Sequence, residues 1–326
     1  MIQYERIIVD TKAYLTVKQD VLRGELGHAY IVICNDNALI ETFFLMCGMT
    51  IMCDNDNSCY SCNSCLRVLN NSHTAIQHLR EEKGLKVEDI ENLISDTILT
   101  TVEKKNRKIY FIYNGEKMNT AAQNKLLKTF EEAPNGITIF IAADNESSLL
   151  STIKSRGKKL HIVSISSESI AKELQSQYPK KSAEEIEYVA YSVMGNVHLA
   201  KKLLVDKDYR KLNDNTLDMI MNMNSSSNIA KYIEHPLMSK TNIAKTIDIM
   251  LMAYSEALSY KAGKRNKSKQ REQYIMNIAD KYSEKALVGV LEVINSAKEK
   301  LFFNANEANV IDSMLFSILE VRYKCK

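Results

Sequence analysis

The sequence predicts an α/β fold for about its first half and an all-helical fold for the rest. Three observations support this: short apolar, β-branched runs early in the chain, a strand–helix–strand pattern between two of them, and no further runs of this kind after about residue 165. Short continuous apolar runs are typical of parallel strands that are buried on both faces. The first half therefore predicts a parallel sheet flanked by helices.

The strand–helix–strand pattern is the clearest local feature of the first half. The runs "KIYFIY" at 108–113 and "ITIFIAA" at 137–143 have the composition of buried strands, as does "AYIVIC" at 29–34. Asn119 is expected to cap a helix between the last two strands, and Pro134 to mark its end. One apolar face of this helix is formed by residues that recur every four positions, namely Met118, Ala122, Leu126 and Phe130. Two parallel strands joined by a helix form a βαβ unit.

Helices are expected throughout the second half. Ser166 or Ser167 can cap the first helix, and Ser182 with Glu185 has the spacing of a capping box at the start of the second. The low content of 3 proline and 10 glycine residues favours long helices over many turns. The clearest apolar stripe lies in the last helix and comprises Val310, Ile311, Met314, Leu315, Ile318 and Leu319.

The length and composition of the chain exclude several classes of protein. A chain of 326 residues is long enough for two or three domains. The formal net charge of +3 is too small to indicate nucleic-acid binding by itself. No apolar run is long enough for a membrane span, and the start "MIQYERIIVD" lacks the pattern of a signal peptide. A cytoplasmic location is therefore expected, where a tight cluster among the 7 cysteines favours metal binding over disulfides.

The segment "CYSCNSC" contains three cysteines at a regular three-residue spacing, and a fourth lies six residues before it. Each Cys-x2-Cys turn places two thiolates at neighbouring corners of a tetrahedron. The candidate zinc ligands are Cys53, Cys59, Cys62 and Cys65. Four protein ligands leave no open position, which predicts a structural zinc. Cys47 competes for the fourth position, although its apolar surroundings are typical of a buried thiol. A redox-active Cys-x2-Cys pair is the alternative function.

The segment "KAGKRNKSKQR" at 261–271 is a run of positive charge whose only apolar residue is Ala262. Its cations are Lys261, Lys264, Arg265, Lys267, Lys269 and Arg271. A solvated, mobile loop between helices is the simpler interpretation, because charge runs usually face water. Contact with nucleic-acid phosphates is the alternative.

Several segments together resemble the clamp-loader branch of the AAA+ proteins. They are "HAYIVIC" at 28–34, the cysteine cluster, "GEKMNTAAQNKLLKTFEEAPNGITIFIAA" at 115–143 and "LLSTIKSRGKKLHI" at 149–162. The segment 303–323 is also similar to the closing helix of that family. The resemblance is densest over residues 1–205, and within the branch it is strongest to subunits of the delta-prime type.

The resemblance implies three domains. An AAA+ nucleotide-binding-like domain is expected at 1–165, with a zinc-binding module inserted at 47–75. A small helical lid domain is expected at 166–208. A helical collar domain, through which subunits oligomerise, is expected at 209–326.

The phosphate loop of an active family member is missing. Such a loop is rich in glycine and ends in Gly-Lys-Ser/Thr, whose amides, ammonium group and hydroxyl hold the phosphates and Mg²⁺. The stretch "CNDNALIETFF" has no glycine, and it has Ile40 and Glu41 at the lysine and hydroxyl positions. The acidic box before Glu116 is also lost, because Tyr113 and Asn114 replace its Asp and Glu. The resemblance therefore implies a chain that neither binds nor hydrolyses ATP productively.

One catalytic element of the family is retained. Family members carry Ser-Arg-Cys, whose arginine reaches into the ATP site of a neighbouring subunit, and this chain has Ser155, Arg156 and Gly157. Arg156 is thus implied to be an arginine finger, a fixed positive charge for the γ-phosphate. Pairing with a surface carboxylate is the alternative. Gly157, in place of the family's Cys, allows a more flexible backbone that could position Arg156 less firmly. His198 and His73 also match family positions, but neither is expected to sense nucleotide or bind metal.

The resemblance implies a scaffold subunit of the DNA polymerase III clamp loader with no catalytic activity of its own. It would join ATPase subunits of the tau/gamma type and a delta-type subunit in a hetero-pentameric ring. It would act on the sliding clamp and primed DNA through the assembled complex. Two alternatives stay open: an ATP-hydrolysing clamp-loader subunit with a divergent phosphate loop, and a zinc-dependent regulatory or redox protein.

Overall fold

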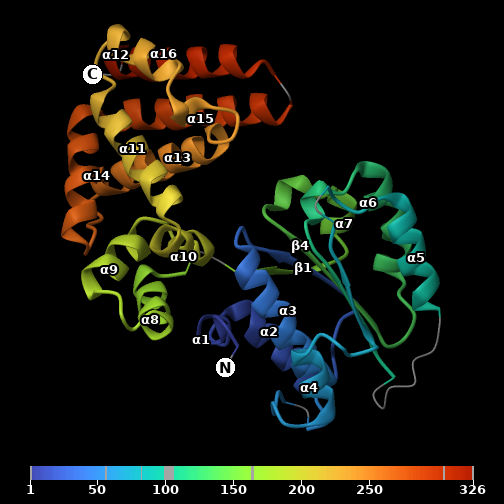
Figure 1. The fold of residues 1–326 in the computed structure, drawn as a ribbon. Coiled ribbons are helices and arrows are strands. Elements are labelled where there is room, and N and C mark those ends of the chain that lie inside the picture. Colours follow the sequence, from blue (N-terminus) through green and yellow to red (C-terminus); the bar gives the residue numbers. More distant parts are fainter. Residues whose placement is uncertain are drawn as a thin grey trace. The chain divides into compact units, whose positions relative to one another are not determined.

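A parallel sheet of five strands organises the first of two units in this chain (Figure 1). The units are Met1–Ser164 and Ile165–Lys326, and each is described by itself. The computed structural model describes residues 2–55, 57–81, 83–98, 106–162, 165–303 and 305–324.

The strands lie in the spatial order β2-β3-β4-β1-β5, and every neighbouring pair is parallel. Their bounds are β1 Ala29–Ile33, β2 Ile76–Leu79, β3 Lys108–Ile112, β4 Ile137–Ala143 and β5 Lys158–His161. The three strands predicted from the sequence are confirmed, and they are the three central strands. The sequence did not predict the edge strands β2 and β5, because their side chains are mostly polar and exposed.

Helices cover both faces of this sheet. The α-helices of the first unit are α1 Glu5–Ile8, α2 Lys12–Leu22, α3 Asn37–Met52, α4 Asn63–Leu69, α5 Val87–Thr97, α6 Thr120–Glu131 and α7 Ser151–Lys154. Figure 1 shows the central strands between α2 and α3 on one side and α5 and α6 on the other. The side chain of Asn119 caps α6 by accepting a hydrogen bond from the amide of Ala122 at 2.8 Å, as predicted.

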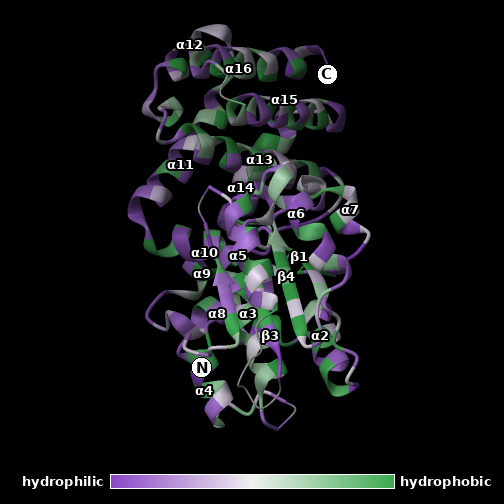
Figure 2. Ribbon diagram, turned by 90° about the vertical axis from the view of Figure 1, so that its right-hand side faces the viewer, coloured by the Kyte–Doolittle hydropathy of each residue, from purple (hydrophilic) through white to green (hydrophobic). Residues whose placement is uncertain are grey.

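Alternate residues of the central strands face the two helical layers. Phe111 and Phe140 pack against Phe44 of α3, with ring centroids 4.4 and 6.0 Å from the centroid of Phe44. On the other face, Ile139 shares a core with Leu126 of α6. The predicted apolar face of α6 is confirmed, because all four of its residues are buried. Figure 2 shows the central strands coloured largely hydrophobic, whereas the surrounding helices carry both colours.

The second unit contains helices and loops but no strand among the residues that the structure describes. Its α-helices are α8 Ser167–Gln177, α9 Ala183–Tyr191, α10 Val197–Val205, α11 Lys207–Asn222, α12 Ser226–Ile233, α13 Ile243–Lys261, α14 Lys269–Lys281, α15 Glu284–Phe302 and α16 Glu307–Lys324. The all-helical second half is thereby confirmed. Its division into a lid and a collar at residue 208 stays a prediction.

Two predicted helix starts can be compared with the structure. The hydroxyl of Ser166 accepts a hydrogen bond from the amide of Ser169 at 3.1 Å and caps α8. The hydroxyl of Ser182 likewise accepts from the amide of Glu185 at 3.2 Å and caps α9. The carboxylate of Glu185 does not complete a capping box, because it pairs instead with Lys181 and Arg210 at 2.9 and 2.6 Å.

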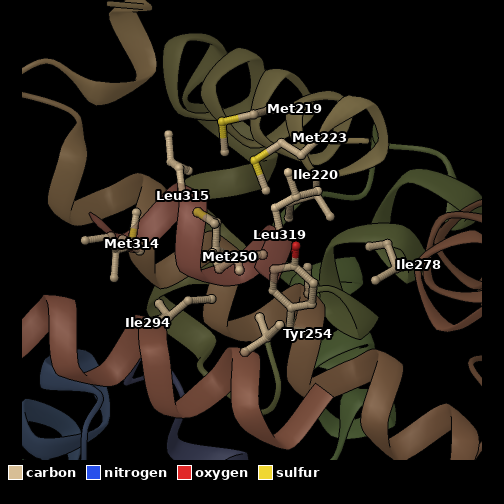
Figure 3. Packing of buried hydrophobic residues seen from close by; sticks show 14 of the residues in the cluster. Met219, Ile220, Met223, Met250, Tyr254, Ile278, Ile294, Met314, Leu315 and Leu319 are labelled. Carbon is tan, nitrogen blue, oxygen red and sulfur yellow. The ribbon is translucent and has the colours of Figure 1, made fainter. Parts of the chain in front are cut away.

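The core of the second unit lies between its longer helices. Figure 3 shows side chains from α11, α13, α14, α15 and α16 that converge on one cluster, among them Met219, Met250, Tyr254, Ile294 and Leu315. The apolar stripe predicted for the last helix is confirmed, since all six of its residues are buried. Within the described parts of the chain, each helix is too short or too polar to cross a lipid bilayer.

Candidate functional site

The junction between β1 and α3 is where a phosphate loop would lie. Asp36 is the N-cap residue of α3, and only 1% of its surface is exposed. Its Oδ1 accepts hydrogen bonds from the amides of Ala38 at 3.0 Å and Leu39 at 3.3 Å. The first amides of a helix otherwise form an anion site, because they lack partners and the helix dipole is positive there. A carboxylate of the chain itself therefore occupies amides that would face a nucleotide.

Ile40 and Glu41 stand at the expected lysine and hydroxyl positions. Ile40 is buried in the core of the unit and brings no charge. Glu41 forms an ion pair with Arg80, with 2.7 Å between Oε1 and Nη1, and both side chains are about half exposed. Arg80 directly follows β2, and its guanidinium carbon lies 4.1 Å from the ring centroid of Tyr113. The two positions thus carry an apolar side chain and a carboxylate paired within the unit.

Tyr113 and Asn114, the positions where the resemblance led us to expect an acidic box, directly follow β3. Tyr113 is buried with its ring edge-on to Phe44 at a centroid distance of 5.0 Å, and its hydroxyl lies 3.0 Å from Nδ1 of His78. Burial raises the pKa of Tyr113, whereas burial and then the nearby Arg80 lower the pKa of His78. Asn114 has a left-handed backbone with φ of 54°. The end of β3 therefore presents an aromatic ring and an amide rather than two carboxylates.

Arg156 lies in the turn between α7 and β5, with 33% of its side chain exposed. Its Nε and Nη2 donate to the two carboxylate oxygens of Glu131, at 3.1 and 3.3 Å. Its Nη1 donates to the carbonyl oxygen of Thr152 at 3.0 Å and lies 3.4 Å from the hydroxyl of Ser155. A pairing with a surface carboxylate is therefore present within this unit, and the role in trans stays a prediction.

Gly157 is required by close packing beside Arg156. A Cβ atom at this position would lie 2.6 Å from Cγ1 of Ile31 and 2.9 Å from Cε1 of Phe130, closer than such atoms approach. The amide of Gly157 also donates to the carbonyl of Ile153 at 3.2 Å. The glycine therefore lets the turn pack against the sheet.

Four cysteines converge next to α3. Their Sγ atoms all lie within 4.8 Å of one another, in the group Cys53, Cys59, Cys62 and Cys65. The pairs Cys53–Cys62 and Cys59–Cys65 each have sulfurs 4.0 Å apart. Tetrahedral zinc with Zn–S bonds near 2.3 Å separates its sulfurs by roughly 3.8 Å. The cluster therefore has the size and the donor set of a metal site.

Hydrogen bonds to the sulfurs favour the form that binds metal. The amide of Cys62 donates to Sγ of Cys59 at 3.3 Å, and the amide of Cys65 donates to Sγ of Cys62 at 3.4 Å. The amide and hydroxyl of Ser61, together with the amide of Cys62, lower the pKa of Cys59 to about 5. Burial raises the pKa of Cys65 to about 12. Metals bind the deprotonated sulfur, and the amide donors at Cys59 and Cys62 stabilise that form.

Cys47 and His73 lie outside this cluster. Cys47 is fully buried in α3, and burial raises the pKa of its thiol well above the ordinary value. Of the two candidates for the fourth ligand, Cys53 is the one that joins the other three sulfurs. His73 is buried beside Arg67, with 3.3 Å between Nε2 and Nη2, and its Nδ1 accepts from the amide of Ala75 at 3.4 Å.

The basic segment 261–271 contains a buried cation. Arg271, in the first turn of α14, forms a bidentate ion pair with Glu256 of α13. Lys267 pairs with Glu168 near the start of α8, with 2.7 Å between Nζ and Oε1. The other five cations of the segment are exposed, as expected for a solvated loop, and only Arg271 at its end departs from that expectation.

Three side chains that shape these regions were missed by sequence reasoning: Asp36, Arg80 and Glu131. Asp36 did carry a signal, since an aspartate directly before a helix is a common N-cap. Arg80 and Glu131 carried none, because their partners lie 39 and 25 residues away in the sequence. His198 lies on an exposed side of α10 in the second unit.

The first half of this chain is similar in sequence to known proteins. Residues 9–166 match the family described as DNA polymerase III, delta subunit. The delta-prime subunit of DNA polymerase III from Haemophilus influenzae is 30% identical over 151 residues, which cover 45% of this chain and 46% of that protein. The delta-prime subunit from Yersinia pestis is 32% identical over 126 residues, which cover 37% of this chain and 36% of that protein.

Two further similarities extend beyond the first unit. The DNA polymerase III gamma subunit of Buchnera aphidicola subsp. Acyrthosiphon pisum is 25% identical over 210 residues, which cover 62% of this chain and 58% of that protein. A solved gamma subunit-related protein from Thermotoga maritima aligns with 95% of this chain and 100% of that one, at 13% identity and a TM-score of 0.45, too low to carry an argument. The chain spans about half the length of the sequence relatives. Residues 9–166 are thus similar to clamp-loader subunits of DNA polymerase III.

Proposed function

We propose that this chain is a non-hydrolysing scaffold subunit, of the delta-prime type, in a DNA polymerase III clamp loader. It would join tau/gamma-type ATPase subunits and a delta-type subunit in a ring that loads the sliding clamp onto primed DNA. The observation that carries the non-hydrolysing role is the buried carboxylate of Asp36, which accepts hydrogen bonds from the first amides of α3. A protein that bound ATP there would need those amides for phosphate.

Charge at the same helix end opposes a nucleotide. Asp36 brings a buried carboxylate, whereas the second carboxylate, that of Glu41 about one turn further along α3, is half exposed and paired with Arg80. Ile40 supplies no compensating cation. Like charges within a few ångströms repel strongly where water is partly excluded. Tyr113 and Asn114 then leave no carboxylate to hold Mg²⁺ or to orient the attacking water.

Arg156 is the residue that we propose acts on a nucleotide, one held by the neighbouring subunit. A guanidinium stays ionised at all physiological pH values, so it can stabilise charge that develops on a γ-phosphate. Its position in a short turn, with Gly157 packed on Ile31, supports a well-defined location for the group. Ser155 precedes Arg156, and its hydroxyl oxygen lies 3.4 Å from Nη1 of the guanidinium.

We also propose that the four clustered cysteines hold a structural zinc. Cys53 follows the end of α3, and Cys62 caps the start of α4. A zinc held by four thiolates has no open coordination position, so it would join these helix ends and the loop between them without taking part in catalysis. The other chemistry that cysteines offer, a redox-active pair, does not require all four sulfurs to converge.

Nucleotide binding tests the scaffold role against the runner-up function, an ATP-hydrolysing subunit with a divergent phosphate loop. The scaffold role predicts no heat of binding when the purified full chain is titrated with Mg·ATP by calorimetry. The ATPase subunit of the same loader serves as the positive control. ATP affinity in the micromolar range for this chain alone would overturn the proposal.

The finger role is tested in the reconstituted loader. The variant Arg156→Ala should slow ATP hydrolysis at the neighbouring subunit's site by on the order of 10³-fold. The total ATPase rate, measured with clamp and DNA, should then fall by the fraction that this one site contributes. Arg23→Ala removes an exposed arginine at the end of α2 and is the matched control. Unchanged stimulated ATPase with Arg156→Ala would refute the finger role.

A further inference from the structure

We infer that Glu131 is a positioning residue for the finger, which holds the guanidinium of Arg156 within this chain until a neighbour's nucleotide competes for it. This inference rests on the proposed finger role of Arg156. Glu131 is the last residue of α6, and α6 packs beside α7, which precedes the finger. The helix end therefore presents its carboxylate directly to the turn that carries Arg156.

All three nitrogens of the guanidinium are engaged inside the unit. Glu131 accepts from Nε at 3.1 Å and from Nη2 at 3.3 Å. Nη1 donates to the carbonyl of Thr152 at 3.0 Å and lies 3.4 Å from the hydroxyl of Ser155. A bidentate contact with phosphate needs two neighbouring N–H groups. A γ-phosphate can contact the guanidinium bidentately only by displacing one of these acceptors.

Among the groups that accept hydrogen bonds from Arg156, Glu131 is the one whose displacement costs the least free energy. Thr152 contributes a backbone oxygen that is fixed by the turn, whereas Glu131 contributes a side chain that is 53% exposed. Exposed ion pairs are screened by water and contribute little to stability. A terminal phosphate carries more negative charge than a carboxylate and also binds arginine bidentately. The pair therefore restrains the finger without preventing its use.

A carboxylate that holds the finger affects the ATPase rate differently from one that only stabilises the fold. Glu131→Gln keeps the shape of the side chain but removes its charge, which frees the guanidinium. The basal ATPase of the reconstituted loader, measured without clamp and DNA, should rise about two- to five-fold, the range that an exposed ion pair allows. The stimulated rate should stay unchanged, because the nucleotide has then already displaced the carboxylate. A structural defect would lower both rates.

The experiment compares four variants of this chain in the reconstituted loader: Glu131→Gln, Glu132→Gln, Arg156→Ala, and the double variant Glu131→Gln/Arg156→Ala. Glu132 is the next residue and is also exposed, so Glu132→Gln controls for the loss of one surface charge. We expect only Glu131→Gln to raise the basal rate, and the double variant to match Arg156→Ala.

The outcomes separate this inference from the function on which it rests. If Arg156→Ala lowers the stimulated ATPase but Glu131→Gln leaves the basal rate unchanged or reduces it, the holding role is wrong and the finger stands. If Glu131→Gln raises the basal rate even alongside Arg156→Ala, the carboxylate acts through another group and the inference is also wrong. If Arg156→Ala changes nothing, the finger role fails and the inference fails with it.

Discussion

Arg271 and Glu256 form a buried, bidentate ion pair in the second unit, with N–O distances of 2.7 and 3.0 Å. Only 1% of the arginine side chain and 11% of the glutamate side chain are exposed. Removal of one partner leaves a charge buried without compensation, which costs about 3–5 kcal/mol. We therefore expect Arg271→Ala to lower the free energy of unfolding of this unit by about that amount in denaturant titrations.

Two variants check the cause of this loss. Arg265→Ala removes an exposed arginine from the same segment and should cost less than about 1 kcal/mol. The double variant Arg271→Met/Glu256→Leu should recover most of the stability, because an apolar pair leaves no buried charge. Equal losses for Arg271→Ala and Arg265→Ala would show that the buried pair is unimportant.

The carboxylate of Glu168 should titrate at unusually low pH. The hydrogen bond from Lys267, then its own backbone amide and the hydroxyl of Tyr191, lower its pKa to about 2. Because the unfolded value is near 4.3, its contribution to stability is fully present above about pH 5 and is lost as the pH falls towards 2. Lys267→Met should raise the pKa of Glu168 towards the unfolded value, as measured by NMR titration. Lys264→Met should leave this pKa where it is.

Gly157→Ala tests the close packing beside the finger. The added Cβ would overlap Ile31 and Phe130, and such overpacking costs about 1–3 kcal/mol. Gly27→Ala is the control, because the nearest atom to its Cβ, the hydroxyl oxygen of Tyr30, would lie at 3.4 Å. Denaturant unfolding should show a smaller loss for Gly157→Ala when Ile31→Ala is also present. An equal loss in both backgrounds would argue against contact with Ile31.

Metal analysis tests the cysteine cluster. The purified chain should contain one zinc, and Cys59→Ser or Cys62→Ser should abolish the metal and lower the unfolding temperature, because binding energy is folding energy at such sites. Cys47→Ala should keep the zinc, since Cys47 lies outside the cluster. Loss of metal in Cys47→Ala would make it the fourth ligand in place of Cys53. A metal-free chain with a disulfide between two of the clustered cysteines would favour the redox alternative.

The sequence was most informative where structure depends on neighbours along the chain. β1, β3 and β4 were predictable because strands buried on both faces need unbroken apolar runs. The four-cysteine cluster was predictable because its ligand spacing is local. β2 and β5 were not, because an edge strand faces solvent and so lacks that signal. The pairs Glu41–Arg80 and Glu131–Arg156 were hidden for another reason: the fold alone brings their members together.

In the segment 261–271, too, contacts with residues outside the segment could not be predicted from the sequence. A run of cations predicts a solvated loop when each charge is treated alike. The structure divides them, because Arg271 is buried against Glu256 whereas Arg265 lies over the ring of Tyr260, 4.1 Å from its centroid. The composition of the segment cannot distinguish Arg271 from Arg265, because their partners Glu256 and Tyr260 lie in α13, before the segment begins.

The carboxylate at the start of α3 also bears on how this chain responds to the energy state of the cell. Asp36 is tethered to the helix whose amides it caps, so its effective concentration does not vary with that of any metabolite. We expect the hydrogen bonds at the start of α3 to stay the same whatever the ratio of ATP to ADP. Ile40→Lys alone would therefore not create an open anion site, because the carboxylate of Asp36 would still accept from those amides.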